Sequence, residues 1–209
     1  MKHCCEDKAI EIKVLQNRQI HVLWAVLWIN AFMFFIEFGA GVISQSTALL
    51  ADSMDMLGDS MVYGFSLYVV NRSSVWKAKA ALLKGCIMAA FGLGVLGELI
   101  YKALYPVIPH AETMGTIGVI ALIANGVCFL LLWNHRDSDL NMRSTWLCSR
   151  NDIIANVGVL LAAAGVAWTQ TLWPDFLVGL IIVAVFLSSA VHVLQQSIAE
   201  LRALAETDT

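Results

Sequence analysis

Long apolar stretches alternate with short polar segments along most of the chain. A helix needs about 20 mostly apolar residues to cross the hydrocarbon core of a bilayer, and six stretches approach or exceed that length. These stretches cover residues 22–43, 47–70, 82–104, 114–134, 146–168 and 175–196. The pattern therefore predicts an all-α membrane protein with six transmembrane helices.

The composition agrees with this prediction. Of all residues, 59% are hydrophobic and 14% are charged, whereas about 25% are charged in a typical soluble domain. The mean hydropathy is +0.73. The polar first twenty residues lack the short apolar core and the small-residue cleavage site of a secretory signal. We therefore expect the first apolar stretch to be a permanent span.

Lys and Arg residues collect in the segments that would lie on one side of a six-span bundle. These segments are residues 1–21, 71–81, 135–145 and the tail after residue 197. On the opposite side, the three short connections contain no Lys or Arg, and only Lys102 lies near them. Because cytoplasmic loops carry an excess of basic residues in membrane proteins, both termini are expected in the cytoplasm.

This topology divides the chain into three parts. Residues 1–20 are expected to form a cytoplasmic tail, residues 21–198 the six-span transmembrane domain, and residues 199–209 a second, short cytoplasmic tail. The second tail is too short to form a folded domain by itself.

The second span contains the sequence ADSMDMLGDS, in which Asp52, Asp55 and Asp59 have the i, i+3, i+7 spacing of one helix face. A carboxylate near the middle of a span costs about 2.5–3.5 kcal/mol. Asp52 follows the span start by about one turn and is expected near the membrane surface. Asp55 and Asp59 lie deeper, where we expect no Lys or Arg at a comparable depth. They are therefore predicted to meet a cation or protons; the alternative is pairing with basic residues.

The fifth span opens as WLCSRNDIIANVGVLL, where Cys148 and Asp152 are four residues apart and share a helix face. Together with Asp55 and Asp59 they offer four donors, the number that Zn²⁺ prefers in tetrahedral sites. The alternative for Cys148 is an inert, buried small hydrophobe. From the expected span starts, Asp152 would lie about 9 Å and Asp59 about 16 Å above the inner boundary. Either the fifth span starts elsewhere, or the helices tilt and bend, or a water-filled inner cavity reaches the site. The polar run 143–152 favours the cavity.

The N-terminal tail contains HCCE, so that His3, Cys4 and Cys5 offer an imidazole and two thiols beside a carboxylate. These ligand types suit a soft or borderline metal ion. The alternative is a tail whose ligands never assemble, because adjacent cysteines do not easily bind one ion tetrahedrally.

Further polar residues lie within the other spans. Glu98 and Lys102 are predicted to form an i, i+4 pair. Asn125 and Asn156 are predicted to form hydrogen bonds between helices. Glu37 lies deep in the first span, where it would relay protons or bond to a neighbouring helix. The chain contains no HExxH motif, so a metal-dependent hydrolase within the membrane is not expected.

The segments ISQSTALLADSMDMLGDS and LNMRSTWLCSRNDIIANVGVLLAA resemble the second and fifth spans of the cation diffusion facilitator family of divalent metal exporters. The likeness covers nearly all of the predicted membrane part. On this resemblance, Asp55, Asp59 and Asp152 occupy metal-ligand positions of the family. Family-typical polar positions are also matched, at Asn30, Glu37 and Asp175.

Two features depart from the family pattern. Cys148 stands where the family usually has His, which suggests a softer metal preference than an all-oxygen site would have. The cytoplasmic C-terminal domain that usually follows the spans is expected to be absent, so dimerisation would rest on the spans or the N-terminal tail.

The resemblance implies an exporter of divalent transition metals that works by proton antiport in the bacterial cytoplasmic (inner) membrane. Zn²⁺ is the expected cargo, with Cd²⁺ and Co²⁺ as further candidates. It implies no enzymatic activity and no cofactor besides the transported ion. The expected partners are metal ions, protons, the lipid bilayer and a second copy in a homodimer, with no nucleic acid. The alternative is a membrane metal sensor or assembly partner that uses the HCCE tail.

Overall fold

In the part of the chain that the computed structural model describes, every regular element is a helix. The structure describes residues 3–69, 74–133 and 140–207. Side chains are described for residues 20–64, 75–133 apart from Lys77, and 150–205. The helices are α1 (His3–Ser44), α2 (Thr47–Val69), α3 (Ser74–Leu104), α4 (Ala111–Trp133), α5 (Leu140–Thr169) and α6 (Trp173–Thr207). The all-α prediction is confirmed for these residues.

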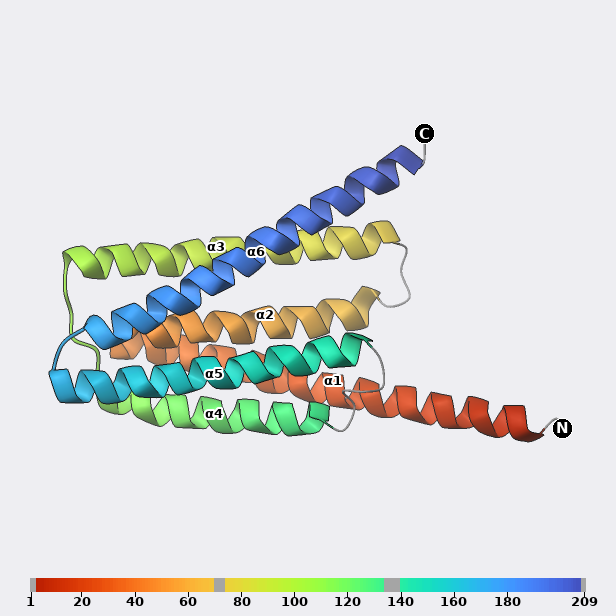
Figure 1. Cartoon of the computed structure of the whole chain (residues 1–209), viewed down its shortest axis with the longest axis horizontal. Coiled ribbons are helices and arrows are strands. Elements are labelled where there is room, and N and C mark those ends of the chain that lie inside the picture. Colours follow the sequence, from red (N-terminus) through yellow and green to blue (C-terminus); the bar gives the residue numbers. More distant parts are fainter. Residues whose placement is uncertain (1–2, 70–73, 134–139, 208–209) are drawn as a thin grey trace.

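Short connections join α1 to α2, α3 to α4 and α5 to α6 at one end of the molecule (Figure 1), which we call the short-loop end. At this end α1 and α5 terminate in the same way. Gln45 and Gln170 adopt left-handed backbone conformations, with φ of 57° and 52°. Each side-chain amide donates a hydrogen bond back to its helix, from Gln45 Nε2 to the Val42 oxygen at 3.2 Å and from Gln170 Nε2 to the Ala167 oxygen at 2.7 Å. These bonds occupy carbonyl groups that a helix end otherwise leaves unpaired.

Helices α1, α2, α4 and α5 form one group, and α3 and α6 pack against each other on its side (Figure 1). The central helix is α2, which contacts α1, α3, α5 and α6. Its first two turns are almost completely enclosed, with Ala48, Leu49, Ala51 and Met54 all at 0% exposure. Helix α2 runs antiparallel to α5 (Figure 1).

The outer surface of the bundle is apolar. On α1, Trp28, Phe32 and Phe35 are 64%, 68% and 71% exposed, and they share one helix face. A surface of this kind suits lipid rather than water. Five of the six helices have described segments that are long and apolar enough to cross a membrane. The exception is α2, which carries three aspartates. The chain is therefore an integral membrane protein.

The predicted span ends agree with the helix ends at the short-loop end within three residues. At the other end the helices continue beyond the predicted spans: α3 begins at Ser74 rather than residue 82, and α5 at Leu140 rather than residue 146. Helix α1 likewise begins at His3, so most of the predicted tail 1–20 belongs to this helix. A helix need not end where its apolar residues end, because water can satisfy the side chains of its polar turns.

Candidate metal site

A cavity of about 560 Å³ lies between α2, α3, α5 and α6. Asp55 and Asp59 line it from α2, and Asp152 lines it from α5. Each of these residues is half-buried. Most of the remaining wall is apolar, with a large share from α6, which diverges from α5 toward its C-terminal end (Figure 1). The three aspartates that were predicted to act together therefore share one cavity.

Asp59 is held from its own helix and faces a like charge on α5. The Tyr63 hydroxyl donates a hydrogen bond to Asp59 Oδ2 at 3.1 Å, from one turn further along α2. The Asp152 carboxyl group of α5 lines the same cavity, close enough for its charge to act on Asp59. Two carboxylates placed in this way favour the binding of a proton or a cation.

Asp152 and Asp59 lie at similar distances from the helix ends opposite the short-loop end. Asp152 lies about 18 Å along α5 from Leu140, and Asp59 lies about 15 Å along α2 from Val69, at 1.5 Å per residue. Measured from the helix ends instead of the predicted span ends, the two positions therefore show little mismatch.

Lys84 corrects a second expectation. No Lys or Arg was expected at the depth of Asp55 and Asp59, yet Lys84 of α3 lines the same cavity. Its ammonium group interacts electrostatically with the Asp59 carboxylate. The expectation was wrong because α3 begins at Ser74, which places Lys84 well inside the helix rather than at its mouth. Asn151 of α5 also lines the cavity.

Asp52 lies little more than one turn after the start of α2, as the sequence predicts, but the bundle encloses it. Asp52 is 1% exposed. Asn156 of α5 donates a hydrogen bond from Nδ2 to Asp52 Oδ2 at 2.7 Å. Asn125 of α4 in turn donates to Asn156 Oδ1 at 3.2 Å, which confirms the predicted bond between helices. Asp52 belongs to a buried polar chain that links α2, α5 and α4, because neighbouring helices cover the start of α2 on all sides.

Glu37 of α1 is fully buried, at 0% exposure. Among the described residues neither of its carboxyl oxygens has a hydrogen-bond partner. Asp52 and Asp55 of α2 lie close enough to act on it electrostatically, and they have the same sign when ionised. The predicted hydrogen bond to a neighbouring helix is therefore not formed in the described part of the structure. An ionised Glu37 would be costly here, so a proton or a cation must accompany it.

The aspartates do not form a closed coordination shell. Within the described ranges, no three His, Cys, Asp or Glu side chains are gathered where they could hold a metal ion. The side chain of Cys148 lies outside the described residues, and so do those of His3, Cys4 and Cys5. These four candidate ligands remain predictions.

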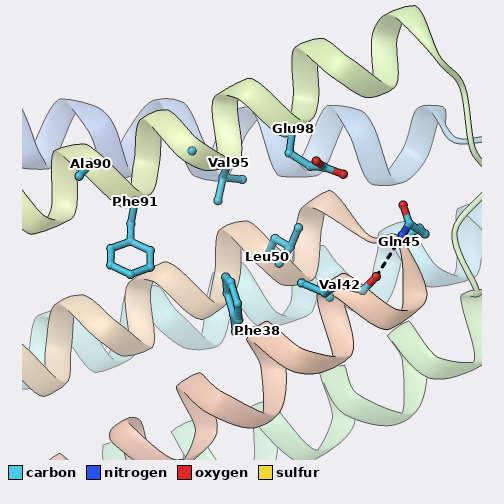
Figure 2. A pocket seen from close by; sticks show the side chains of 10 residues that line it. Phe38, Val42, Gln45, Leu50, Ala90, Phe91, Val95 and Glu98 are labelled. Carbon is cyan, nitrogen blue, oxygen red and sulfur yellow. Dashed lines mark hydrogen bonds between the residues drawn. The ribbon is translucent and has the colours of Figure 1, made fainter.

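A second cavity of about 520 Å³ lies between α1, α2 and α3 (Figure 2). Its wall is mainly apolar, and Phe38 and Phe91 both line it. The one carboxylate in its wall, Glu98, pairs with Lys102 at 3.5 Å, as predicted from the i, i+4 spacing. Lys102 also donates a hydrogen bond to the Gln45 oxygen at 2.7 Å. This cavity therefore lacks the carboxylate cluster that a metal site would need.

Asp175 has a structural role that the sequence pattern did not reveal. It lies in the first turn of α6 and is 1% exposed. Its Oδ1 accepts hydrogen bonds from Ser46 Oγ at 2.5 Å and from the Ala48 amide at 3.0 Å. Its Oδ2 accepts from the Thr47 amide at 2.8 Å and from Thr47 Oγ1 at 2.7 Å. Asp175 thus caps the start of α2 from another helix, a position that the helix dipole also favours for a carboxylate.

An all-helical membrane protein that encloses three carboxylates and an ammonium group in one cavity belongs to the class of membrane proteins that handle ions or protons. The sequence matches the cation efflux transmembrane domain family over residues 23–202. Because this match covers most of the chain, the protein belongs to the cation efflux family.

Relatives in several bacteria are similar to the chain. A cadmium, cobalt and zinc/H⁺–K⁺ antiporter of Bacillus velezensis is 26% identical over 87% of this chain and 62% of its own length. The zinc transporter ZitB of Escherichia coli is 27% identical, over 83% of this chain and 59% of its own. The metal cation efflux system protein CzcD of Cupriavidus metallidurans is 25% identical, over 82% and 60%. The chain therefore spans about three fifths of the length of these relatives.

Proposed function

We propose that the protein exports divalent transition metal ions, Zn²⁺ foremost, in exchange for protons. The observation that carries this proposal is the single cavity into which α2 and α5 together place Asp55, Asp59 and Asp152. Carboxylates bind either a divalent ion or protons, so the same groups can exchange one for the other. Metal binding should accordingly weaken as the pH falls, because protons then occupy the ligands.

The proposed coordination shell consists of Asp55, Asp59, Asp152 and Cys148. Rotation of the side chains would bring the donors around one ion, and a wall rich in apolar groups would strengthen their attraction to it. The names of the relatives support zinc, cadmium and cobalt as candidate ions. His3, Cys4 and Cys5 would offer a weaker capture site before the first span.

The proposed topology has six spans with both termini in the cytoplasm of a bacterial cell, in the inner membrane. Helix α2 has 23 residues. It is therefore about 34 Å long at 1.5 Å per residue, which matches a hydrocarbon core of about 30 Å. Its aspartates face the cavity rather than lipid, so they do not prevent it from crossing the membrane. We further propose a homodimer as the working unit.

Transport into vesicles tests the proposal. The purified protein is reconstituted, a pH gradient is imposed, and the uptake of Zn²⁺, Cd²⁺ and Co²⁺ is measured. We expect uptake that depends on the gradient and that falls to background in Asp59→Asn and Asp152→Asn, while both variants still fold. Glu112→Gln is the matched control, because Glu112 is an exposed carboxylate in the first turn of α4, away from the cavity.

Two results would count against the proposal in different ways. Undiminished uptake in both aspartate variants would rule out the site. Uptake that is independent of the pH gradient would rule out proton exchange, while leaving metal transport intact.

A further inference from the structure

Lys84 brings a positive charge into a cavity whose other ionisable wall residues are aspartates. It lines this cavity together with Asp55, Asp59 and Asp152, and it is half-buried. Its charge acts on the Asp59 carboxylate. If all three carboxylates are ionised, the ammonium group leaves two negative charges, which one divalent ion neutralises. The cavity therefore already contains a positive charge beside the candidate ligands.

The backbone position of Lys84 is fixed by the packing of the next residue, Gly85, against α6. Gly85 faces α6 so closely that a Cβ there would lie 2.8 Å from Leu194 Cδ2. A second contact of this kind lies two turns on, where a Cβ on Gly92 would lie 2.6 Å from Leu187 Cδ2. Close packing of α3 on α6 thus sets the rotation of α3, and this rotation directs Lys84 into the cavity.

Lys84 can move without moving the candidate ligands. It comes from α3, whereas Asp55 and Asp59 come from α2 and Asp152 from α5. The lysine side chain has a flexible four-carbon stem with a compact charge at its end. The ammonium group can therefore approach the carboxylates in the absence of metal and withdraw when an ion enters.

We propose that Lys84 is an internal counter-cation of the transport site, which pairs with the aspartates when no metal is bound and thereby lowers the affinity for the metal ion. This inference rests on the proposed function. A transport site must bind an ion well enough to capture it and weakly enough to release it. Lys84 favours release in two ways, because it repels the bound ion and it takes the ion's place on the oxygens.

Equilibrium binding of Zn²⁺ to the purified full-length protein in detergent, measured by titration calorimetry at constant pH and ionic strength, tests this role. We expect Lys84→Gln to bind Zn²⁺ about tenfold more tightly than the wild type, because a repulsive charge has been removed from the site. In vesicles the same variant should transport more slowly at saturating Zn²⁺, because release becomes slower. Lys84→Met is a second neutral variant in case the amide disturbs folding.

Two controls separate charge from other effects. Lys84→Arg keeps the positive charge and should bind Zn²⁺ with nearly wild-type affinity. Lys79→Gln removes an exposed charge from the same helix and should leave the affinity unchanged. The proposal fails if the neutral variants bind no more tightly than the wild type, or if Lys84→Arg tightens binding as much as they do.

A further variant distinguishes this proposal from the proposed function. If the wild type binds Zn²⁺, Asp59→Asn loses that binding and the neutral Lys84 variants match the wild type, only the role of Lys84 is refuted. If the wild type itself binds no divalent metal, the proposed function fails and the role of Lys84 fails with it.

Discussion

At the scale of single residues, Glu37 is a buried carboxyl group that has no hydrogen-bond partner among the described residues. It is fully enclosed, and in the described part of the chain its two oxygens accept no hydrogen bond. A buried polar group without a partner costs about 1–3 kcal/mol in proteins, and more if it is charged. Stability alone does not account for a carboxyl group at this position, which is consistent with a role in handling protons.

Replacing Glu37 by methionine should therefore stabilise the protein. The side chains are similar in volume, and methionine has no oxygen to satisfy, so we expect a gain of about 1–3 kcal/mol in the free energy of unfolding. Thermal unfolding in detergent measures the change. Glu98→Met is the matched control, because it removes a carboxylate that does have a partner, Lys102. A lower melting temperature for Glu37→Met than for the wild type would contradict the expected sign.

At this scale the candidate ligands could be predicted from the sequence, but the residues that surround them in the folded protein could not. The spacing of Asp55 and Asp59 puts them on one helix face whatever the fold, and their cost in a span singles them out. The hydrogen-bond partner of Asp52 and the presence of Lys84 in the cavity depend on how α3 and α5 pack against α2. Periodicity describes the faces of one helix and contains no information on which neighbour covers each face.

At the scale of the helices, the start of α2 depends on Asp175. Four hydrogen bonds from Ser46, Thr47 and Ala48 end on this one carboxylate. The first amide groups of a helix have no partner within the helix, and those of α2 are buried, where water cannot replace a lost partner.

We expect Asp175→Ala to lower the free energy of unfolding by more than about 2 kcal/mol, because it removes a cap and leaves several buried donors unpaired. Asp175→Asn should fall between this variant and the wild type, since its amide keeps only one acceptor oxygen. Chemical or thermal unfolding in detergent compares the three proteins. Glu112→Ala, an exposed first-turn acid on α4, should change stability by less than about 0.5 kcal/mol. Equal losses for both alanine variants would show that the cap is unimportant.

The ends of the helices were predictable only where the chain turns tightly. At the short-loop end, apolar stretches stop at turns, so the sequence pattern and the helix ends coincide. At the opposite end α3 and α5 continue through polar residues, and no Gly or Pro precedes their first predicted apolar turn. The depths expected for Asp152 and Asp59 were counted from the predicted span ends, so this difference in helix bounds also affects the comparison of the two positions.

At the scale of the whole molecule, the candidate site lies entirely within the bundle. Asp55, Asp59, Asp152 and Lys84 all come from helices α2, α3 and α5. The HCCE segment lies at the far end of α1, on the same side as the C-terminus (Figure 1). The bundle and the tail are therefore separate candidates for the working part of the protein.

Deletion of residues 1–10 distinguishes a transporter from a sensor that depends on its tail. We expect the shortened protein to keep at least half of the Zn²⁺ uptake at saturating metal, because every carboxylate of the cavity remains in place. Uptake at low metal concentration should fall if the tail captures ions for the bundle. His3→Ala combined with Cys4→Ser and Cys5→Ser gives the same test without shortening α1. Complete loss of uptake in both proteins would favour the sensor.

The cap on α2 also affects the order in which the helices can reach their final fold. Ser46 and Asp175 are 129 residues apart in the chain. A ribosome makes the first two helices long before it reaches the residue that pairs with the turn between them. During synthesis the buried donors of this turn must remain hydrated or find temporary partners, because their permanent acceptor arrives only with α6. The arrival of α6 is therefore the step that locks the earliest hairpin, and a chain interrupted before it would retain a loose second helix.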